Sequence, residues 1–175
     1  MKLTSSKELL KTPIFSITED EAEEPGGFHI KRAIVQHKGS AVMMAVDDKK
    51  RILLVRQYRL PARQFLWELP AGRLDEGESP LQAAKRELVE EAGVRAKKWK
   101  KLVSYYPSPG FLAERMTLFV ATELSLGEAQ PMEDERIEMR WFKAKEVEEL
   151  IGSGKIIDGK TLVGYLMWRR FGGKA

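Results

Sequence analysis

The feature that most restricts how this chain can fold is a short, strongly marked helix between glycines, in the segment GRLDEGESPLQAAKRELVEEAGV. Ser79 is a good N-cap, Pro80 suits the first helical position, and Gln82 completes a capping box with Ser79. Gly93 suits the left-handed residue that follows a helix C-terminus. The sequence therefore predicts a helix that begins at Pro80 and ends just before Gly93.

Like charges gather on one face of this helix. Glu87, Glu90 and Glu91 are neighbours, because offsets of three and four residues bring helical side chains together. Two carboxylates about 6 Å apart repel by roughly 3 kcal/mol at an effective dielectric near 20. The helix macrodipole also disfavours anions near the C-terminus. Arg86 lies four residues before Glu90 and can pair with only one of the three carboxylates. An apolar stripe beside them is expected to face the core: Leu81, Ala84, Leu88 and Ala92.

Two interpretations of the acidic face follow. The ordinary one is a solvated surface, because charge runs usually face water. The other is a site for a divalent cation. Mg²⁺ accepts one or two protein carboxylates and keeps its remaining positions for water and substrate phosphate. The helix alone does not decide between them.

Composition excludes several classes of protein. The 175 residues, 43% of them hydrophobic, suit one globular domain with a single core. The chain has no cysteine, which removes disulfides, thiolate catalysis and cysteine-based zinc sites, and fits a cytoplasmic location. The start MKLTSSKELLKTPIF has no long apolar run, so neither a signal peptide nor a membrane span is predicted.

Charge argues against nucleic acid as a partner. The net charge is +4 and the pI about 9.2. The basic residues are scattered among 26 acidic ones, and the longest basic cluster is AKKWKK. This distribution favours an anionic small molecule over nucleic acid.

Hydrophobic periodicity predicts a mixed β-sheet flanked by helices, that is, an α/β or α+β fold. Residues 1–25 are polar, end in EDEAEEPGG, and are expected to form a surface linker or loop. DDKK at 47–50 is expected to be a hairpin turn. Strands are predicted within 28–39, 40–46, 51–58, 65–69, 102–106, 115–124 and 136–142. Two further amphipathic helices, each stopped by glycine, are predicted within 144–154 and 159–173.

The acidic helix and its flanks resemble the Nudix box, G-x5-E-x7-R-E-U-x-E-E-x-G-U, where U is aliphatic. Every fixed position is filled at its spacing: Gly72, Glu78, Arg86, Glu87, Leu88, Glu90, Glu91, Gly93 and Val94. The resemblance to the Nudix hydrolase superfamily favours the cation site over the solvated surface. It implies an α/β/α sandwich in which a loop–helix–loop holds Mg²⁺ or Mn²⁺ for hydrolysis of a nucleoside diphosphate linked to another group.

The resemblance also implies a role for each position of the box. The glutamates at Glu87 and Glu91 bind metal in this family, and Glu90 supports or shares that role. The remaining positions are structural, with the glutamate and the arginine fixing the loop against the helix: Gly72, Glu78, Arg86 and Gly93.

The residues around the box resemble the ADP-ribose pyrophosphatase branch of the superfamily. In that branch an ELPAG run precedes the box, and the backbone carbonyl at Ala71 is a further metal ligand. Arg59 and Glu68 correspond to residues that contact the nucleotide. Pro109 and Gly110, in an SPG setting after the box, are associated with the ADP-ribose class. A strand followed by a turn, and a β-turn between strands, are the simpler explanations of these two segments.

A late acidic loop is the last part of this resemblance. PMEDERIEMRWF matches a loop that contributes one glutamate to the active site, as a metal ligand or as the group that positions water. Glu135 is the first choice for that residue and Glu133 the second. The alternative is an exposed acidic loop.

The N-terminal part resembles a strand that precedes the box-bearing domain. The resemblance implies an N-terminal segment over 1–38, which could be exchanged between the subunits of a homodimer, and a Nudix hydrolase domain over 39–175. Phe28 and Arg32 are the candidates to complete an adenosine pocket. Both could equally be ordinary strand residues.

Together these features imply Mg²⁺-dependent hydrolysis of ADP-ribose to AMP and ribose 5-phosphate, with Glu135 or Glu90 orienting the attacking water. A second hypothesis keeps this chemistry and changes the substrate to another nucleotide sugar or a dinucleotide, such as GDP-mannose, NADH or a diadenosine polyphosphate. A third is a module that senses the nucleotide without cleaving it. The expected partner is a small nucleoside diphosphate, with neither nucleic acid nor membrane involved.

Overall fold

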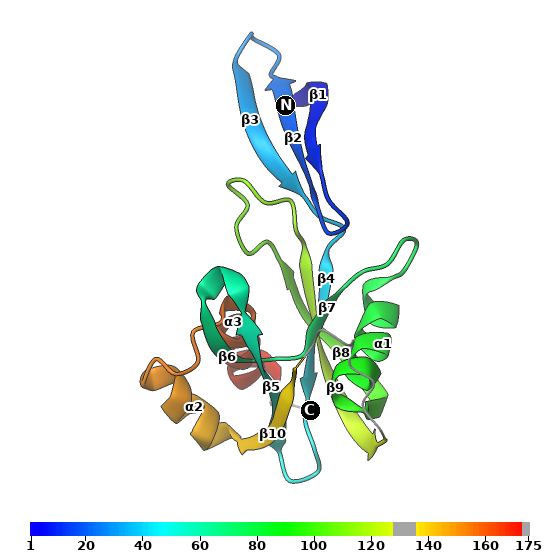
Figure 1. Cartoon of the computed structure of the whole chain (residues 1–175), viewed down its shortest axis with the longest axis vertical. Coiled ribbons are helices and arrows are strands. Elements are labelled where there is room, and N and C mark those ends of the chain that lie inside the picture. Colours follow the sequence, from blue (N-terminus) through cyan, green and yellow to red (C-terminus); the bar gives the residue numbers. More distant parts are fainter. Residues whose placement is uncertain (128–135, 173–175) are drawn as a thin grey trace. The chain divides into compact units, whose positions relative to one another are not determined.

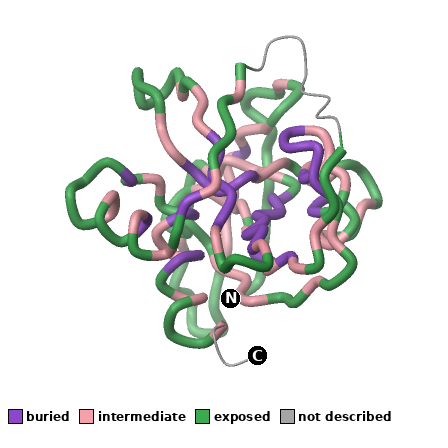
Figure 2. Tube along the Cα trace, turned by 90° about the horizontal axis from the view of Figure 1, so that it is seen from below, coloured by how far each residue is buried: buried purple, intermediate pink, exposed green. Residues whose placement is uncertain are grey.

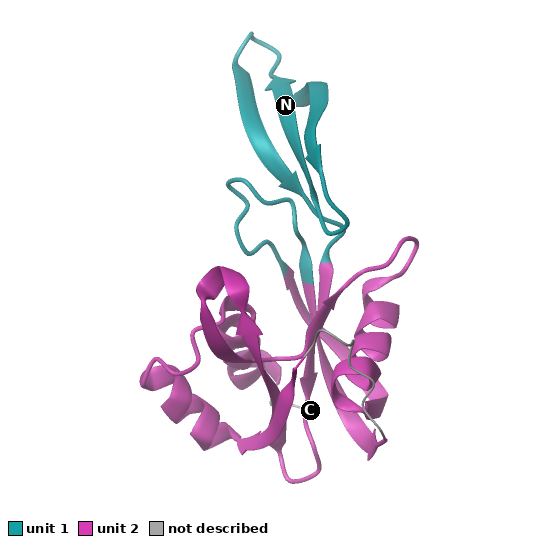
Figure 3. Ribbon diagram, in the orientation of Figure 1, with its two compact units in different colours: residues 1–39, 105–116 teal, residues 40–104, 117–175 magenta. Residues whose placement is uncertain are grey.

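The computed structural model describes residues 1–127 and 136–172 (Figure 1). The chain divides into two compact units (Figure 3). The first comprises residues 1–39 and 105–116, and the second comprises residues 40–104 and 117–175. Sequence analysis did not predict that residues 105–116 belong with the N-terminal segment. They join it because the Val35 N–H donates to the Phe111 carbonyl at 2.8 Å and the Ala113 N–H donates to the Val35 carbonyl at 2.9 Å.

A three-stranded sheet, in the order β1-β2-β3, forms most of the first unit. Its strands are β1 (Lys2–Lys11), β2 (Ser16–Glu23) and β3 (His29–Gln36), and both pairings are antiparallel. The expectation of a linker or loop over residues 1–25 is therefore wrong. β1 and β2 are a hairpin, closed by the Thr12 hydroxyl, which accepts a hydrogen bond from the Phe15 N–H at 3.0 Å.

The acidic run that suggested a loop is stabilised as a strand by one lysine. Lys31 on β3 lies 2.8 Å from a Glu19 carboxylate oxygen and 3.0 Å from a Glu21 carboxylate oxygen on β2. Its hydrogen bond lowers the pKa of Glu21. Opposite charges on neighbouring strands stabilise a sheet, so the acidic residues do not prevent pairing here.

The described residues of the second unit form two sheets and three α-helices. The four-stranded sheet has the order β7-β4-β9-β8, and the three-stranded sheet has the order β10-β5-β6. The strands are β4 (Ser40–Ala45), β5 (Arg51–Arg59), β6 (Gln64–Glu68), β7 (Ala71–Arg73), β8 (Val94–Tyr105), β9 (Met116–Leu126) and β10 (Glu138–Lys143). The helices are α1 (Pro80–Ala92), α2 (Ala144–Gly152) and α3 (Gly159–Met167), with short turns η1 (Leu60–Ala62) and η2 (Trp168–Gly172).

Most predicted elements are present, with two differences in the strands. β8 begins at Val94, so the basic cluster lies within a strand that was predicted to start later. The turn at 47–50 exists, since the Lys50 N–H donates to the Asp47 carbonyl at 2.9 Å. However, β4 and β5 enter different sheets, and the isolated Val46–Ile52 bridge pairs the residue after β4 with β5. All six residues of β4 are buried, which is expected of a central strand covered on both faces.

The core of the second unit lies on both faces of the four-stranded sheet, and the buried residues concentrate in this unit (Figure 2). One face packs against α1, whose buried residues Ala84, Leu88 and Ala92 join Met43 and Phe119 of the strands. This confirms the predicted apolar stripe. Among the described residues, no helix has the length and apolarity that crossing a membrane requires.

On the other face, α3 approaches the sheet closely at Gly164. A methyl group placed there would lie 2.5 Å from Leu118 and 2.7 Å from Leu69. Such distances are well below ordinary contact, so only glycine lets this helix approach so closely. The two helices α1 and α3 therefore cover opposite faces of one sheet.

Candidate active site

Helix α1 has the ends that the sequence predicts. The Ser79 N–H donates to the Gln82 side-chain oxygen at 2.9 Å, and the Gln82 N–H donates to the Ser79 hydroxyl at 3.4 Å, which completes the capping box. Gly93 has a φ of 60°, in the left-handed region. These local interactions fix where the helix begins and ends, and so fix the positions of its carboxylates.

Arg86 lies between the carboxylates of the helix. Its Nη1 donates to Glu87 at 2.8 Å and to Glu90 at 3.0 Å. The Glu90 side chain is 43% exposed and that of Glu87 only 15%. Glu91 is buried. One guanidinium therefore offsets the repulsion between two of the three negative charges, which is more than the single pair predicted from spacing.

The same arginine joins the helix to the loop before it. Its Nε and Nη2 donate to Glu78 at 3.1 and 2.8 Å, and Nη2 also donates to the Arg73 carbonyl at 3.1 Å. The hydrogen bond with Glu78 raises the pKa of Arg86 and lowers the pKa of Glu78. Both groups therefore stay charged at neutral pH. The structure thus brings Glu78 and Arg86 together across the loop.

Strand β7 meets the two inner glutamates of the helix. The Ala71 N–H donates to Glu91 Oε2 at 3.3 Å. At Gly72 an added Cβ would lie 1.8 Å from the carboxyl carbon of Glu87. The structure therefore gathers Ala71, Gly72, Glu87 and Glu91 at one place, from segments that are 15 to 20 residues apart in the chain.

The contact at Gly72 leads to the first prediction. We expect Gly72→Ala to push the Glu87 carboxylate away from β7 and to lower kcat/KM about a hundredfold, because a displacement of about 1 Å in an active site has an effect of that size. Folding should change little, since the obstructed atoms are the end of a flexible side chain. Steady-state kinetics and thermal melting would test this.

Gly152→Ala, where the added methyl meets open space, is the matched control. Equal kinetics in the two variants would contradict the prediction.

A second cluster surrounds Glu68, a fully buried carboxylate at the end of β6. Arg59 binds it through two hydrogen bonds of 2.8 Å, from Nε and Nη2. Lys160 Nζ also donates to it. With Glu68 enclosed in this way, the geometry favours a role in positioning Arg59 over direct contact with a nucleotide. Arg59 itself is partly exposed.

Sequence analysis missed Lys160 and its neighbours at the start of α3. Asp158 caps this helix by accepting hydrogen bonds from the Thr161 N–H and from Lys160 Nζ, both at 3.0 Å. The Thr161 hydroxyl accepts a hydrogen bond from the Leu69 N–H at 2.8 Å. A signal was available, because Lys160 lies one turn before the buried Gly164 and so falls on the packed face of the helix.

The pKa of Arg59 also depends on the charge of Glu91, a glutamate of the box. Burial lowers its pKa, but the hydrogen bond and charge of Glu68 raise it, as do the charges of Glu91 and Asp158, so that the net direction is upward. The guanidinium therefore stays positive. The electrostatic influence of Glu91 on Arg59 places the two candidate clusters in one neighbourhood within the second unit.

In the first unit, three of the predicted substrate residues line one hollow. Arg32 of β3 and the loop residues Pro109 and Gly110 border a cavity of about 440 Å³, together with Tyr106 and Phe111. Phe28 does not line it and is 61% exposed. The structure therefore brings Arg32 together with Pro109 and Gly110, but not with Phe28.

Glu135 and Glu133, the predicted late glutamates, lie outside the described residues.

The donors at β7 suit a hard divalent cation. Two carboxylates and the nearby peptide of Ala71 offer only oxygen ligands, and Mg²⁺ needs no more than one or two carboxylates from the protein. The described residues contain no group of three or more acidic or histidine side chains arranged to hold a metal by themselves. The donor set therefore fits a cation that shares its coordination with water and substrate.

The sequence model of the NUDIX domain matches residues 36–162 of this chain. The chain belongs to the Nudix family. This confirms the family and the α/β fold class predicted from the box, and with them the assignment as a Nudix hydrolase. Nudix hydrolases are in general dependent on a divalent metal.

Relatives of this Nudix protein cover nearly its whole length. It is 38% identical to the ADP-ribose pyrophosphatase of Bacillus subtilis, over 92% of this chain and 91% of the relative. It is 37% identical to the ADP-ribose pyrophosphatase of Mycobacterium tuberculosis, over 93% and 81%. A methanol dehydrogenase activator of Bacillus methanolicus is 34% identical over 93% and 89%.

A solved structure shares the fold of this Nudix protein. It is described as the crystal structure of an ADP compounds hydrolase. It superposes with a TM-score of 0.82, covering 99% of this chain and 96% of the other, at 18% sequence identity. At that identity the likeness concerns the fold alone.

Proposed function

We propose that this protein hydrolyses ADP-ribose to AMP and ribose 5-phosphate with Mg²⁺ or Mn²⁺. The observation that most supports this is the meeting of Glu87 and Glu91 with the Ala71–Gly72 strand, inside an unbroken Nudix box. The substrate follows from the relatives, since two that are 37–38% identical to this chain are named ADP-ribose pyrophosphatase.

Glu87, Glu91 and the Ala71 carbonyl would hold the cation. When bound, a cation of this kind neutralises charge on a diphosphate and makes a bound water more acidic. Arg59 binds Glu68 through Nε and Nη2, which fixes the plane of its guanidinium. Its remaining nitrogen, Nη1, would then donate to a phosphate or ribose oxygen of the substrate.

The attacking water needs a carboxylate to orient it and to take its proton. Glu90 is the candidate among the described residues, because it is partly exposed and held by Arg86. Glu135, with Glu133 as second choice, remains the other candidate. In the first unit, Arg32, Pro109 and Gly110 are the candidates to contact the substrate, and Phe28, which does not line their cavity, is a separate candidate.

The test is a panel of substrates in Mg²⁺ and, separately, Mn²⁺: ADP-ribose, GDP-mannose, NADH and a diadenosine polyphosphate. We expect the highest kcat/KM for ADP-ribose, with AMP and ribose 5-phosphate as the separated products. A higher kcat/KM for another compound would make that compound the substrate, with the same hydrolysis of a diphosphate bond. Tight binding of ADP-ribose without turnover would indicate a nucleotide-sensing module and not an enzyme.

The N-terminal segment over 1–38 belongs to the same proposal, as a part that packs on the partner subunit of a homodimer, with residues 39–175 as the catalytic domain. Support comes from β1, all of whose residues are exposed, including Leu3, Leu9 and Leu10. Light scattering after gel filtration should give a mass twice that of one chain, which is 20.0 kDa. Leu10→Asp should lower the measured mass toward that of a single chain. A single-chain mass for the unaltered protein would contradict the dimer.

A cytoplasmic location completes the proposal, since a cysteine-free chain suits a reducing compartment.

A further inference from the structure

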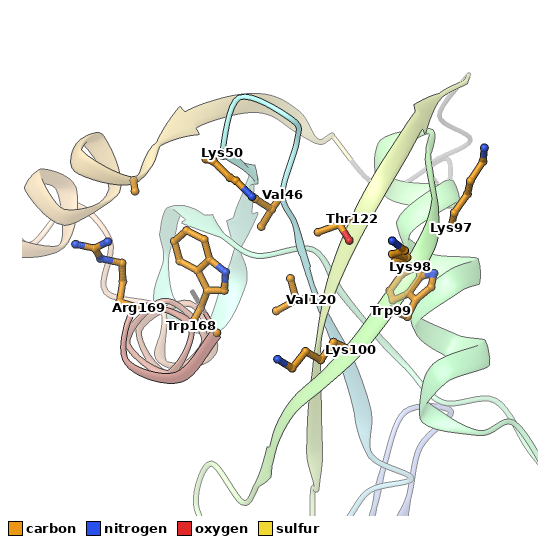
Figure 4. Close-up of a pocket in the computed structure, with 12 residues that line it drawn as sticks. Val46, Lys50, Lys97, Lys98, Trp99, Lys100, Val120, Thr122, Trp168 and Arg169 are labelled. Atoms are coloured by element: carbon orange, nitrogen blue, oxygen red, sulfur yellow. The ribbon is translucent and has the colours of Figure 1, made fainter. Parts of the chain in front are cut away.

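A second cavity, of about 770 Å³, lies within the second unit. Its lining comes from the residue after β4, the middle of β9, β8, the turn at Lys50, the first residue of α2 and the π-helix η2 after α3 (Figure 4). None of the box carboxylates is among the described residues that line it. Its volume is within the range of about 300–1,000 Å³ that is typical of small-molecule sites.

The cavity exists because α3 is shorter than the sheet face it covers. Side chains alternate between the two faces of a strand. Phe119 and Ala121 of β9 join the core beneath α1, so Leu118, Val120 and Thr122 face the other way. α3 packs on Leu118 through Gly164. The α-helix ends at Met167 and continues as the π-helix η2, which leaves Val120 and Thr122 only partly buried.

Trp168 borders this partly buried face. It follows the last residue of α3, and its indole packs on Gly172, where an added Cβ would lie 2.5 Å from the ring. Figure 4 shows the indole lying across the cavity from Val46 and Val120. An aromatic wall opposite an aliphatic floor suits a flat, apolar body between them.

The rim of the cavity is basic. Among the described residues that line it, none is acidic and five are basic: Lys50, Lys97, Lys98, Lys100 and Arg169. Outside the cavity, Lys98 pairs with Glu123 at 2.6 Å and Arg169 pairs with Glu148 at 3.0 Å.

Lys50 and Lys100 differ from Lys98 and Arg169, the two basic residues of the rim that form ion pairs. Neither Lys50 nor Lys100 forms an ion pair within the part of the chain that the structure describes, and both extend on the cavity side of the sheet in Figure 4. Lys50 has a φ of 56°, a backbone conformation that lysine rarely adopts. The cavity therefore offers two positive charges, from different elements, that are not neutralised by neighbouring side chains.

We propose that this cavity is a second, non-catalytic site for a nucleoside monophosphate or a similar aromatic phosphate. The aromatic ring would lie against Trp168, over Val46 and Val120. The phosphate would lie at Lys100, since lysine binds phosphate as a point charge, and Lys50, at the other end of the cavity in Figure 4, would add positive charge there. This site stands apart from the proposed hydrolysis, because it uses the sheet face opposite α1.

The test uses AMP as the probe and the whole protein in excess chelator, so that binding is measured without a divalent cation. Titration calorimetry should detect AMP binding, and amide NMR signals of Val46, Val120 and Thr122 should shift. Lys100→Glu should weaken binding about tenfold or more. Lys101→Glu is the matched control, because Lys101 follows Lys100 on the same strand, points to the other face of the sheet and does not line the cavity; it should bind like wild type.

Further arms separate the two halves of the ligand. Adenosine, which lacks the charge, and ribose 5-phosphate, which lacks the ring, should each bind at least tenfold more weakly than AMP. Equal affinity of AMP for the Lys101→Glu and Lys100→Glu variants would overturn the proposal. So would shifts confined to residues around Gly72 and Glu91, or no binding at all. Lys50→Glu provides a second variant should Lys100→Glu fail to fold. None of these outcomes depends on ADP-ribose being the substrate.

Discussion

Glu91→Gln is expected to lower turnover of ADP-ribose about a thousandfold while the protein stays folded. Glu91 is buried, and its carboxylate accepts a hydrogen bond from the Ala71 N–H. Glutamine keeps the size and the accepting oxygen but removes the charge that would bind a cation. A thousandfold loss corresponds to about 4 kcal/mol of transition-state stabilisation, which is within the several kcal/mol that a metal ion can supply.

Two measurements distinguish this effect from unfolding. The thermal midpoint of Glu91→Gln should lie within a few degrees of wild type, and calorimetry with Mn²⁺ should show weaker uptake. Glu149→Gln, on the exposed face of α2, is the charge-matched control and should keep full activity. Hydrolysis at the wild-type rate by Glu91→Gln would show that the assignment of the metal site is wrong.

Lys160→Met is expected to lower the free energy of unfolding by about 3 kcal/mol. Breaking a buried ion pair by removing one partner leaves an uncompensated charge, which typically costs about 3–5 kcal/mol. Glu68 is fully buried and would keep Arg59 as its only cation in this cluster, so the lower end of that range applies. The midpoint of urea unfolding measures the loss.

The matched control for this change is Lys145→Met. The Lys145 side chain is 87% exposed, so its replacement should alter stability by no more than about 0.5 kcal/mol. The double variant Glu68→Gln/Lys160→Met should recover part of the loss, because it no longer buries an uncompensated charge. If Lys160→Met unfolds at the wild-type urea concentration, the ion pair contributes nothing measurable to stability.

The sequence predicted those parts of the structure that depend on neighbours in the chain. Helix α1 is the clearest case, because Ser79, Gln82 and Gly93 act within one turn of each end, and the box residues follow from the helix. The contacts between the helix and β7 could be expected only through the resemblance to a family. The composition of the chain said nothing of them.

Two features could not be predicted from local pattern. The partners Glu68 and Lys160 are 92 residues apart, and no periodicity links positions so distant. In the first unit, β1 has no buried face, so the alternation that identifies most strands was absent. The lysine that neutralises the acidic strand, Lys31, acts across the sheet, and its effect becomes visible only once the register of β2 and β3 is known.

Arg86 has a consequence for how the Nudix loop meets its ligands. One guanidinium joins Glu78 and the Arg73 carbonyl in the loop to Glu87 and Glu90 on the helix. These hydrogen bonds fix the conformation of the loop between β7 and α1 before any ligand binds. Ligand binding therefore costs little conformational entropy in this loop. The loop is thus preorganised, and we expect a cation to bind at β7 without a prior rearrangement of the loop.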